Sequence, residues 1–356
     1  MLTSLEADRR RIPVLETQIL ELQQALLALQ TEKDVVQSRL DGYRYPVLTL
    51  PNEIISEIFL CFIPSYPHPP PLAGSTSPTL LTHICRTWRE IAIAIPQLWR
   101  ALDFTDEAPI IPLEQQKHLG ALWIERSKAC LICVRLIGSL PALSALVPYM
   151  PRCEHLSLSL NALCSSMLYS SMPLLRVLGV DLMDVNEGYT HCRLTFCDTP
   201  KLHTVVLKSF IINHIDLPWS QLTSLSLIDA FARETEIILR QTPHLVHLAV
   251  DFLSRDSLDD NPVYPDIELL HVQICNLHSE LGSPYPEFFH SLVTPSLEHL
   301  QLSGGFVEQD NHIDSLNSFI SKSGCKLSHL LIKGQYAVTE TYCEAFPSIP
   351  DIVCKG

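Results

Sequence analysis

Histidines recur along the C-terminal part of the chain, each beside a leucine of a spaced series. His155, His247, His299 and His329 stand directly before a leucine, and His271 stands directly after one. Imidazole rings can bind metal ions, transfer protons or hydrogen-bond a polar partner. Because a histidine on a polar strand face is most simply a surface residue, the pattern favours contacts with a peptide or protein over a metal site.

The other residues that could support catalysis form no recognisable motif. Cys130 and Cys133 have the spacing of a zinc-binding pair, but no second pair follows, and strand alternation would direct the two thiols to different faces. No Gly-x-Ser-x-Gly elbow, phosphate-binding glycine loop or His-Glu-x-x-His helix occurs. We therefore expect a protein that is not an enzyme and that holds no metal and no cofactor.

The composition indicates a globular chain of two or more folded units. Of 356 residues, 47% are apolar and 18% are charged, and the net charge is −14 without a basic patch, which excludes nucleic acid as a natural partner. The chain shows neither an apolar leader segment nor an apolar run long enough to cross a bilayer, so no membrane contact is expected. The cysteines lie in apolar strings, as reduced thiols do, which favours a cytoplasmic and/or nuclear location.

A short leucine pattern recurs where the histidines lie. Eight segments fit Pro/Ser/Cys-x-Leu-x-x-Leu-x-Leu or a close variant: 152–158, 173–180, 200–207, 220–227, 243–250, 265–272, 295–302 and 325–332. Repeats of this length with one short strand each are typical of leucine-rich repeats. The fold class expected is α+β, and residues 110–356 should form an irregular leucine-rich-repeat-like α/β solenoid of eight or nine parallel strands.

Strand alternation predicts which residues of this domain face solvent. The paired leucines should point into the core, and the residues beside them should line the concave face. Short helices are expected at 234–240 and 313–321 on the convex side, and a first strand at 131–136. If their repeats are adjacent, His299 and His329 should be neighbours. The expected substrate-binding residues are His155, His247, His271, His299, Gln301, His329 and Lys333.

The first 44 residues carry the heptad pattern of a coiled-coil helix. One register holds Leu5, Ile12, Ile19, Leu26 and Leu40, and the register three residues later holds Leu15, Leu22, Leu29 and Val36. Lys33 interrupts the first register and Asp8 the second. Because Pro13 cannot donate a backbone hydrogen bond, we expect an amphipathic helix over residues 13–41. It could form a homodimer, or it could fold onto its own chain.

Residues 45–104 predict a pair of short amphipathic helices. Pro51 and Glu53 are typical of a helix start, and Pro64 ends that helix. Ser77 followed by Pro78 opens the second helix. Between them, the proline-rich stretch 64–78 predicts a loop. Helices this short with broad apolar faces bury too little surface to be stable alone, so a neighbouring domain or a partner must cover them.

Three parts of this segment resemble the F-box family. Leu50-Pro51-Asn52-Glu53-Ile54-Ile55 matches the Leu-Pro-x-Glu-Ile-Leu/Ile opening of that family. Ile84-Cys85-Arg86 with Trp88 matches Val-Cys-Arg-x-Trp, and residues 95–100 match the closing Pro-x-Leu-Trp-Arg. The insertion at 64–78 departs from a compact F-box. The leader helix, the Tyr45-Pro46 entry and this insertion together make residues 5–104 similar to F-box proteins of mushroom-forming fungi, of the type with a C-terminal leucine-rich-repeat-like domain.

The resemblance implies docking on the Skp adaptor and, through it, on a cullin. The chain would then be the substrate-recognition subunit of a Skp–cullin–F-box ubiquitin ligase, with a protein target on the repeat surface. By position, the adaptor-binding residues would be Leu50, Pro51, Ile54, Ile55, Ile58, Leu80, Leu81 and Ile84. Cys85, Trp88 and Trp99 would form the F-box core. The alternatives are that these residues are the ordinary core of a helical hairpin, or that the chain is a repeat-based interaction scaffold without a ligase role.

Overall fold

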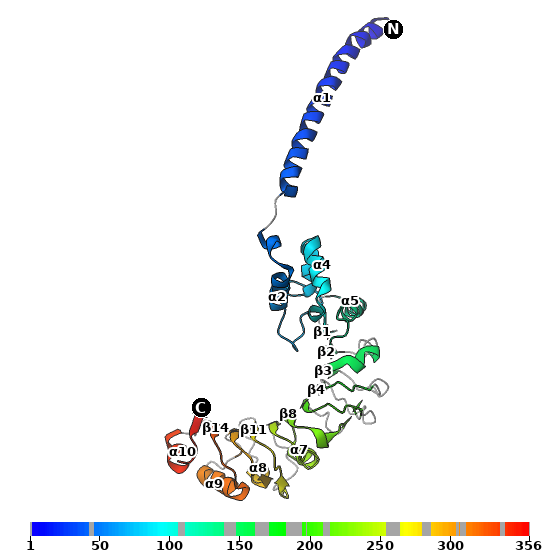
Figure 1. Cartoon of the computed structure of the whole chain (residues 1–356). Helices are drawn as coiled ribbons and strands as arrows, with labels where there is room; N and C mark the ends of the chain where they lie inside the picture. The colour runs from blue at the N-terminus through cyan, green and yellow to red at the C-terminus, as the bar shows by residue number, and fades with distance from the viewer. Residues whose placement is uncertain are drawn as a thin grey trace. The chain divides into compact units, whose positions relative to one another are not determined.

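The computed structural model describes residues 2–42, 46–105, 111–138, 147–160, 171–182, 194–196, 198–208, 214–253, 264–279, 286–303, 306, 311–334 and 339–355. The chain divides into two compact units, residues 1–57 and 58–356. The structure contains a long N-terminal helix and a large parallel sheet with helices, which is an α+β composition (Figure 1). Among the described residues, no helix has both the length and the apolar content that crossing a bilayer requires.

The first unit is mainly the helix α1 (Leu2–Gly42), followed by the 3-10 turn η1 (Pro46–Thr49). The expectation that this helix begins near Pro13 is wrong, because Pro13 lies inside it. A proline within a helix removes one backbone hydrogen bond. The carbonyl of Pro13 accepts a hydrogen bond from the Thr17 hydroxyl at 2.9 Å, and the flanking turns of this 41-residue helix continue on both sides.

Short helices follow over residues 52–99. Their bounds are α2 (Asn52–Phe62), η2 (Pro78–Leu80), α3 (Leu81–Ile84), α4 (Arg86–Ala94) and η3 (Pro96–Trp99). The Pro51 carbonyl accepts hydrogen bonds from the Ile54 and Ile55 amides, so Pro51 stands just before the first turn of α2. Ser77 caps η2 as expected, because its hydroxyl oxygen accepts from the Thr79 amide at 3.2 Å. Cys85 is extended and separates α3 from α4.

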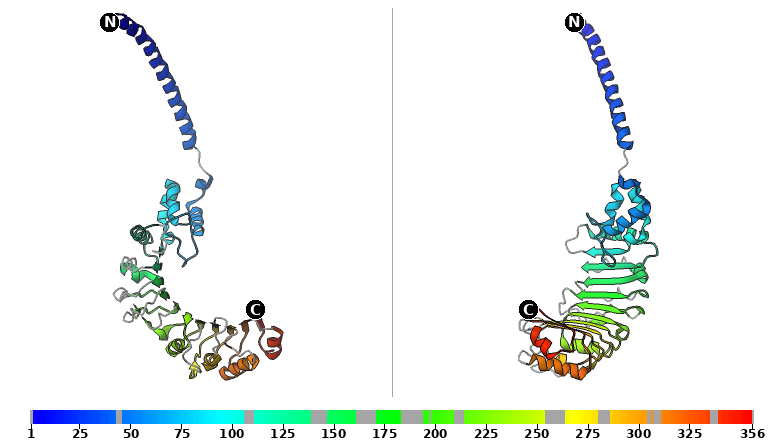
Figure 2. Two further views of the ribbon diagram at one scale, coloured as in Figure 1. Left: turned by 180° about the vertical axis from the view of Figure 1, so that it is seen from behind. Right: turned by 60° about the vertical axis from the view of Figure 1, so that its left-hand side comes forward.

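The second unit is built on a parallel sheet of eleven strands within the described residues (Figure 2). In spatial order they are β1 (Ala101–Thr105), β2 (Ile132–Gly138), β3 (Cys153–Leu160), β4 (Val177–Leu182), β6 (Thr204–Lys208), β8 (Ser224–Ala230), β9 (His247–Phe252), β11 (Ile274–Ser279), β13 (His299–Ser303), β14 (His329–Lys333) and β15 (Asp351–Lys355). Two short parallel pairs lie beside it, β5 (Leu194–Thr195) with β7 (Ile215–Asp216) and β10 (Ile267–Glu268) with β12 (Leu292–Val293).

The strands are in register, so their apolar residues form continuous buried rows. The pairings align one central residue from each strand in sequence: Leu102, Val134, Leu156, Leu178, Val205, Leu225, Leu248, Cys275, Leu300, Leu330 and Ile352. All eleven are at most 9% exposed. A second buried row lies two residues later, from Phe104 to Ile332, because alternate residues of a strand share a face. Each strand therefore covers its neighbour's apolar side chains.

The remaining helices connect the strands of the second unit. Within the described residues they are α5 (Leu113–Arg126), η4 (Val147–Arg152), η6 (Trp219–Gln221), α7 (Ala232–Leu239), α8 (Pro286–Ser291), α9 (His312–Ser323) and α10 (Thr339–Ala345). The helices expected at 234–240 and 313–321 correspond to α7 and α9. In Figure 1, α7, α8 and α9 lie along one side of the curved sheet.

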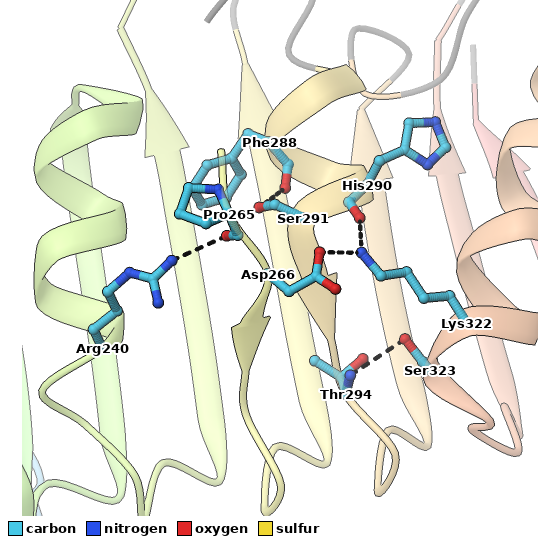
Figure 3. Close-up of polar contacts among 9 residues, drawn as sticks. All are labelled: Arg240, Pro265, Asp266, Phe288, His290, Ser291, Thr294, Lys322 and Ser323. Carbon is cyan, nitrogen blue, oxygen red and sulfur yellow. Dashed lines mark hydrogen bonds and ion pairs between the residues drawn. The ribbon is translucent and has the colours of Figure 1, made fainter. Parts of the chain in front are cut away.

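Polar contacts join successive connecting segments on the helical side (Figure 3). Arg240 donates to the Pro265 carbonyl at 3.0 Å. Lys322 pairs with Asp266 at 2.6 Å and donates to the His290 carbonyl at 2.7 Å. These bonds link segments 25 to 56 residues apart in sequence. They hold one connection against the next, independently of the backbone bonds of the sheet.

The sheet differs from its sequence-based description in three places. Within 265–272 only the two-residue strand β10 forms, and it lies outside the large sheet. The strand of the large sheet is β11, which begins at Ile274 and has Cys275, not Leu270, as its central residue. The sheet also starts earlier than the expected strand at 131–136, because β1 pairs with β2 from Ala101 onward. The last strand, β15, was not expected at all. The number of strands is accordingly greater than eight or nine.

Candidate functional site

Helix α2 presents an apolar stripe to solvent. Ile54 is 48% exposed and Ile58, one turn later, is 45% exposed, while Leu50 just before the helix is 38% exposed. Pro51 is exposed as well. Residues four apart lie on one face of a helix, so Ile54 and Ile58 form a continuous apolar edge. Large apolar side chains grouped in this way are typical of a protein-binding surface.

A second exposed apolar pair lies at the turn from η2 into α3. Leu80 is 41% exposed, and Ile84 is 54% exposed. They too are four residues apart, so they share one side of this turn. Of the residues expected to bind an adaptor, these two and the four at α2 are therefore accessible.

Two of the expected adaptor-binding residues are buried, and the structure corrects their role. Ile55 is 1% exposed and Leu81 is 3% exposed. The reason is helical periodicity: Ile55 lies about 100° around α2 from Ile54, on the same side as the fully buried Phe59. These side chains can support the surface by fixing the helices, but they cannot contact a partner directly.

The expected helical core residues are packed to different degrees. Trp99 is fully buried, and its indole nitrogen donates to the Ala92 carbonyl at 2.9 Å. Trp88 is half-buried and packs edge-on against Phe59, with ring centres 4.9 Å apart. Its buried indole nitrogen has no hydrogen-bond partner among the described residues. Cys85 is half-buried, and its sulfur accepts from the Trp88 amide at 3.5 Å.

The proline-rich insertion is anchored at both of its ends. Near its end, the Leu72 carbonyl accepts hydrogen bonds from the Ser77 and Thr79 hydroxyls at 3.0 and 3.1 Å. Near its start, the Tyr66 hydroxyl donates to the Glu154 carboxylate of β3 at 3.0 Å. The Arg100 guanidinium lies 3.8 Å from the centre of the Tyr66 ring. The insertion is therefore an ordered segment held on the first strands of the sheet.

A cleft of about 250 Å³ opens beside this segment. It is lined by the end of α2, the insertion and the start of β1, namely Leu60, Ile63, Pro64, Ser65, Tyr66, His68, Pro70, Gln97, Arg100 and Ala101. Burial and the hydrogen bond to Glu154 both raise the pKa of Tyr66. The phenol is therefore a neutral hydrogen-bond donor near neutral pH, which is a structural role rather than a nucleophilic one.

His155 was expected on the open face of the sheet, and the structure limits that role. Its side chain is 22% exposed and contacts Tyr66 edge-on, with ring centres 5.3 Å apart. Burial lowers the pKa of His155, although the nearby Glu154 carboxylate opposes this effect. Because the insertion covers it, His155 belongs to the anchoring of Tyr66 rather than to an accessible binding surface.

The last strands of the sheet bring most of the other expected residues together. His299 and His329 are paired across β13 and β14 with ring centres 5.8 Å apart, which confirms that they are neighbours. His329 makes a 2.6 Å contact to the Asp351 carboxylate on the next strand. Gln301 and Lys333 follow on the same polar side, Gln301 half-buried and Lys333 exposed. The cluster can hydrogen-bond and pair with an acidic or amide-bearing partner.

The remaining two histidines occupy different settings. His247 is exposed and shares the row of His299, with Ile274 between them on β11. His271 is not on a strand: it lies in the turn before β11, with its ring 5.9 Å from that of His244. The expected strand position of His271 is wrong, because the strand of the large sheet, β11, begins only at Ile274. It does not line the polar face with the others.

Elsewhere on this face, acidic and basic side chains pair with one another across strands. The Arg135 guanidinium donates two hydrogen bonds to the Asp103 carboxylate, and the one from Nε to Oδ1 is 2.8 Å long. Lys208 lies 3.8 Å from Asp181, and burial raises the pKa of Asp181 despite that lysine. Among the described residues, no group of three or more His, Cys, Asp and Glu could hold a metal ion.

Sequence reasoning missed Tyr66, Arg100 and Asp351 as members of these clusters. Tyr66 and Glu154 are 88 residues apart in sequence, so no local sequence pattern predicts their contact. Asp351 could have been found, because Ile349, Ile352 and Cys354 continue the leucine pattern with substitutions. A comparison of the sequence with protein-family models gives no match. A comparison with curated proteins also finds no relative.

Proposed function

We propose that this chain is the substrate-recognition subunit of a Skp–cullin–F-box ubiquitin ligase. Its F-box-like helices would bind the Skp adaptor, and its sheet would hold a target protein. The observation that carries the proposal is the coincidence of sequence and exposure at α2. The Leu-Pro-Asn-Glu-Ile-Ile segment that resembles the start of an F-box is also the place where Leu50 and Ile54 are exposed, and Ile58 is exposed one turn later.

The other two F-box-like segments support the same proposal. The turn with exposed Leu80 and Ile84 leads directly into Cys85, Arg86 and Trp88. The closing Pro-x-Leu-Trp-Arg segment is η3, whose Leu98 and Trp99 are buried. A partner would bury exposed apolar area at α2 and α3, at about 25 cal/mol per Å² of apolar surface. The fully buried Trp99 donates to the Ala92 carbonyl and so holds η3 against α4.

The sheet would act as the target-binding half. We propose that it is a leucine-rich-repeat-like arc, because successive central residues are 20 residues (Val205 to Leu225) to 32 residues (Leu102 to Val134) apart and all pair in parallel. The open polar face near His299, His329 and Lys333 would contact the target. No bond is made or broken by this chain; it would accelerate ubiquitin transfer by holding a target lysine near a charged enzyme.

Co-purification tests the proposal against the alternative of a scaffold without a ligase role. The full chain should capture both the Skp adaptor and a cullin, and the double variant Ile54→Asp/Ile58→Asp should capture neither. Ile237→Asp on α7 is the matched control, because Ile237 is an exposed helical isoleucine (60%) remote from α2 in sequence. Capture of the adaptor without a cullin would favour the scaffold, and equal capture by all three chains would exclude docking through α2.

A further inference from the structure

Among the described residues, helix α1 carries an exposed apolar surface. Every described side chain from Leu5 to Gly42 is exposed. Thirteen large apolar side chains in this range are 43 to 69% exposed, from Leu15 at the low end to Leu22 at the high end. A helix with this much exposed apolar surface is stabilised in water when another surface packs on it.

The heptad registers define the stripe that a partner helix would cover. The a positions are Leu5, Ile12, Ile19, Leu26, Lys33 and Leu40, and the d positions are Asp8, Leu15, Leu22, Leu29 and Val36. Two residues of opposite charge interrupt this apolar stripe, Asp8 near the start of the helix and Lys33 near its end. Pro13 falls at a b position, which faces away from such an interface, so its ring would not disturb the packing.

The two charged residues discriminate between the possible pairings of two identical helices. A parallel, in-register pair places each a or d residue against its own copy. Lys33 would then face Lys33 of the second copy, and Asp8 would face Asp8. Each of these layers places like charges inside an apolar stripe, which is unfavourable.

An antiparallel pair removes both conflicts. It pairs a residues with d residues of the other chain, and in one register the layers are Leu5 with Val36, Ile12 with Leu29, Ile19 with Leu22, Leu26 with Leu15, and Lys33 with Asp8. Each layer occurs twice. Shifting the register by one heptad either way places Asp8 against Leu26 or Leu40. In the unshifted register, Arg11 of one copy and Glu32 of the other lie beside the apolar stripe and carry opposite charges.

We propose that α1 binds α1 of a second copy of this chain as an antiparallel coiled coil, with Lys33 of each copy paired to Asp8 of the other. The inference does not depend on the proposed ligase function. At a rise of 1.5 Å per residue, the two Gly42 ends would stand about 60 Å apart along the coil.

Exchanging the charges at positions 8 and 33 in the full chain tests both dimer formation and the antiparallel orientation of the two helices. The mass in solution, measured by light scattering and sedimentation, should be twice that of one chain. Lys33→Asp and Asp8→Lys should each raise the dimer Kd by about tenfold, because both ends become repulsive. The double variant should return Kd to the wild-type value. Gln24→Asp, at an outward f position, is the control and should leave Kd unchanged.

A distance measurement decides the direction independently. A bio-orthogonal spin label in place of Ser38, also an f position, should give an inter-chain distance of about 50 Å in the antiparallel dimer. A parallel dimer would bring the two labels within about 20 Å. A monomer, a larger oligomer, a short distance between the labels, or failure of the double variant to restore binding would each overturn the proposal.

Discussion

The Tyr66 hydroxyl donates a hydrogen bond to the Glu154 carboxylate, and this contact joins the proline-rich insertion to strand β3 of the sheet. The Glu154 side chain is only 13% exposed, and its other oxygen lies 3.4 Å from the Arg176 guanidinium. Arg100 lies over the Tyr66 ring, and His155 packs against that ring edge-on. One phenol therefore ties a segment between two F-box-like motifs to the domain that follows them.

Removal of the Tyr66 hydroxyl should weaken the fold. Tyr66→Phe keeps the ring and deletes one hydrogen bond to a largely buried carboxylate, which should lower the free energy of unfolding by about 1–2 kcal/mol. Urea denaturation followed by circular dichroism measures the change. In a Glu154→Ala background, the same substitution should cost much less, since its partner is absent. Equal costs in both backgrounds would show that the hydrogen bond does not stabilise this chain.

Gly120 provides a second stability test, at the first connecting helix. A Cβ at Gly120 of α5 would lie 2.5 Å from Cζ of Phe104 on β1, and Phe104 is 1% exposed and cannot turn away freely. Gly120→Ala should therefore destabilise the chain by about 1–3 kcal/mol, although alanine favours helices. Gly42→Ala is the control, because no atom of the described residues lies within 4 Å of its added carbon. A melting temperature raised by Gly120→Ala would contradict the packing described.

The thiol of Cys275 should make stability depend on pH in the alkaline range. Burial raises the pKa of Cys275 to about 12 from an ordinary value of 9.0. The folded chain thus keeps a proton that the unfolded chain loses first, so the contribution is complete below pH 9 and falls as the pH rises from 9 toward 12. The advantage of the wild type over Cys275→Ala should then be smaller at pH 10.5 than at pH 7.5. A constant difference between the two denaturation series would argue against a buried thiol.

The polar face at the end of the sheet should decide target binding without affecting the adaptor. His299→Ala/Lys333→Ala removes two exposed side chains from β13 and β14 and should reduce capture of target proteins about tenfold or more. Lys326→Ala, an exposed lysine in the turn before β14, is the matched control. Quantitative mass spectrometry of the captured proteins measures the target proteins and the Skp adaptor for each variant. Loss of the Skp adaptor along with the targets would show that the double variant damages the fold instead.

Periodicity predicted the parts of this fold that depend on local sequence. The strands around Leu156, Leu225 and Leu300 follow from leucines at fixed offsets, and α9 follows from a helical pattern. The strand at β11 was misplaced because Leu270 fits the same offsets as Cys275. Pairing decides between them: Cys275 aligns with Leu248 on one side and with Leu300 on the other. A cysteine in a leucine row is recognised only when its neighbours in space are known.

The binding surfaces were predicted less completely, because exposure depends on tertiary packing. The sequence motif does not distinguish Ile54 from Ile55, but in the fold Ile55 is buried and Ile54 is exposed. In the same way, His155 and His299 both precede a leucine of the repeat, but His155 packs on Tyr66 of the insertion while His299 contacts His329. Residue type and spacing identified the candidates, and the three-dimensional fold selected among them.

The most direct test of the proposed function is the affinity of the purified full chain for the purified Skp adaptor. Calorimetry should give saturable one-to-one binding for the wild type and the same Kd for Ile237→Asp. Ile54→Asp/Ile58→Asp should bind at least about 100-fold more weakly, because two central apolar contacts are lost. Its melting temperature should be unchanged, since both side chains are exposed. Absence of binding by the wild type, or equal affinity for the double variant, would contradict the account.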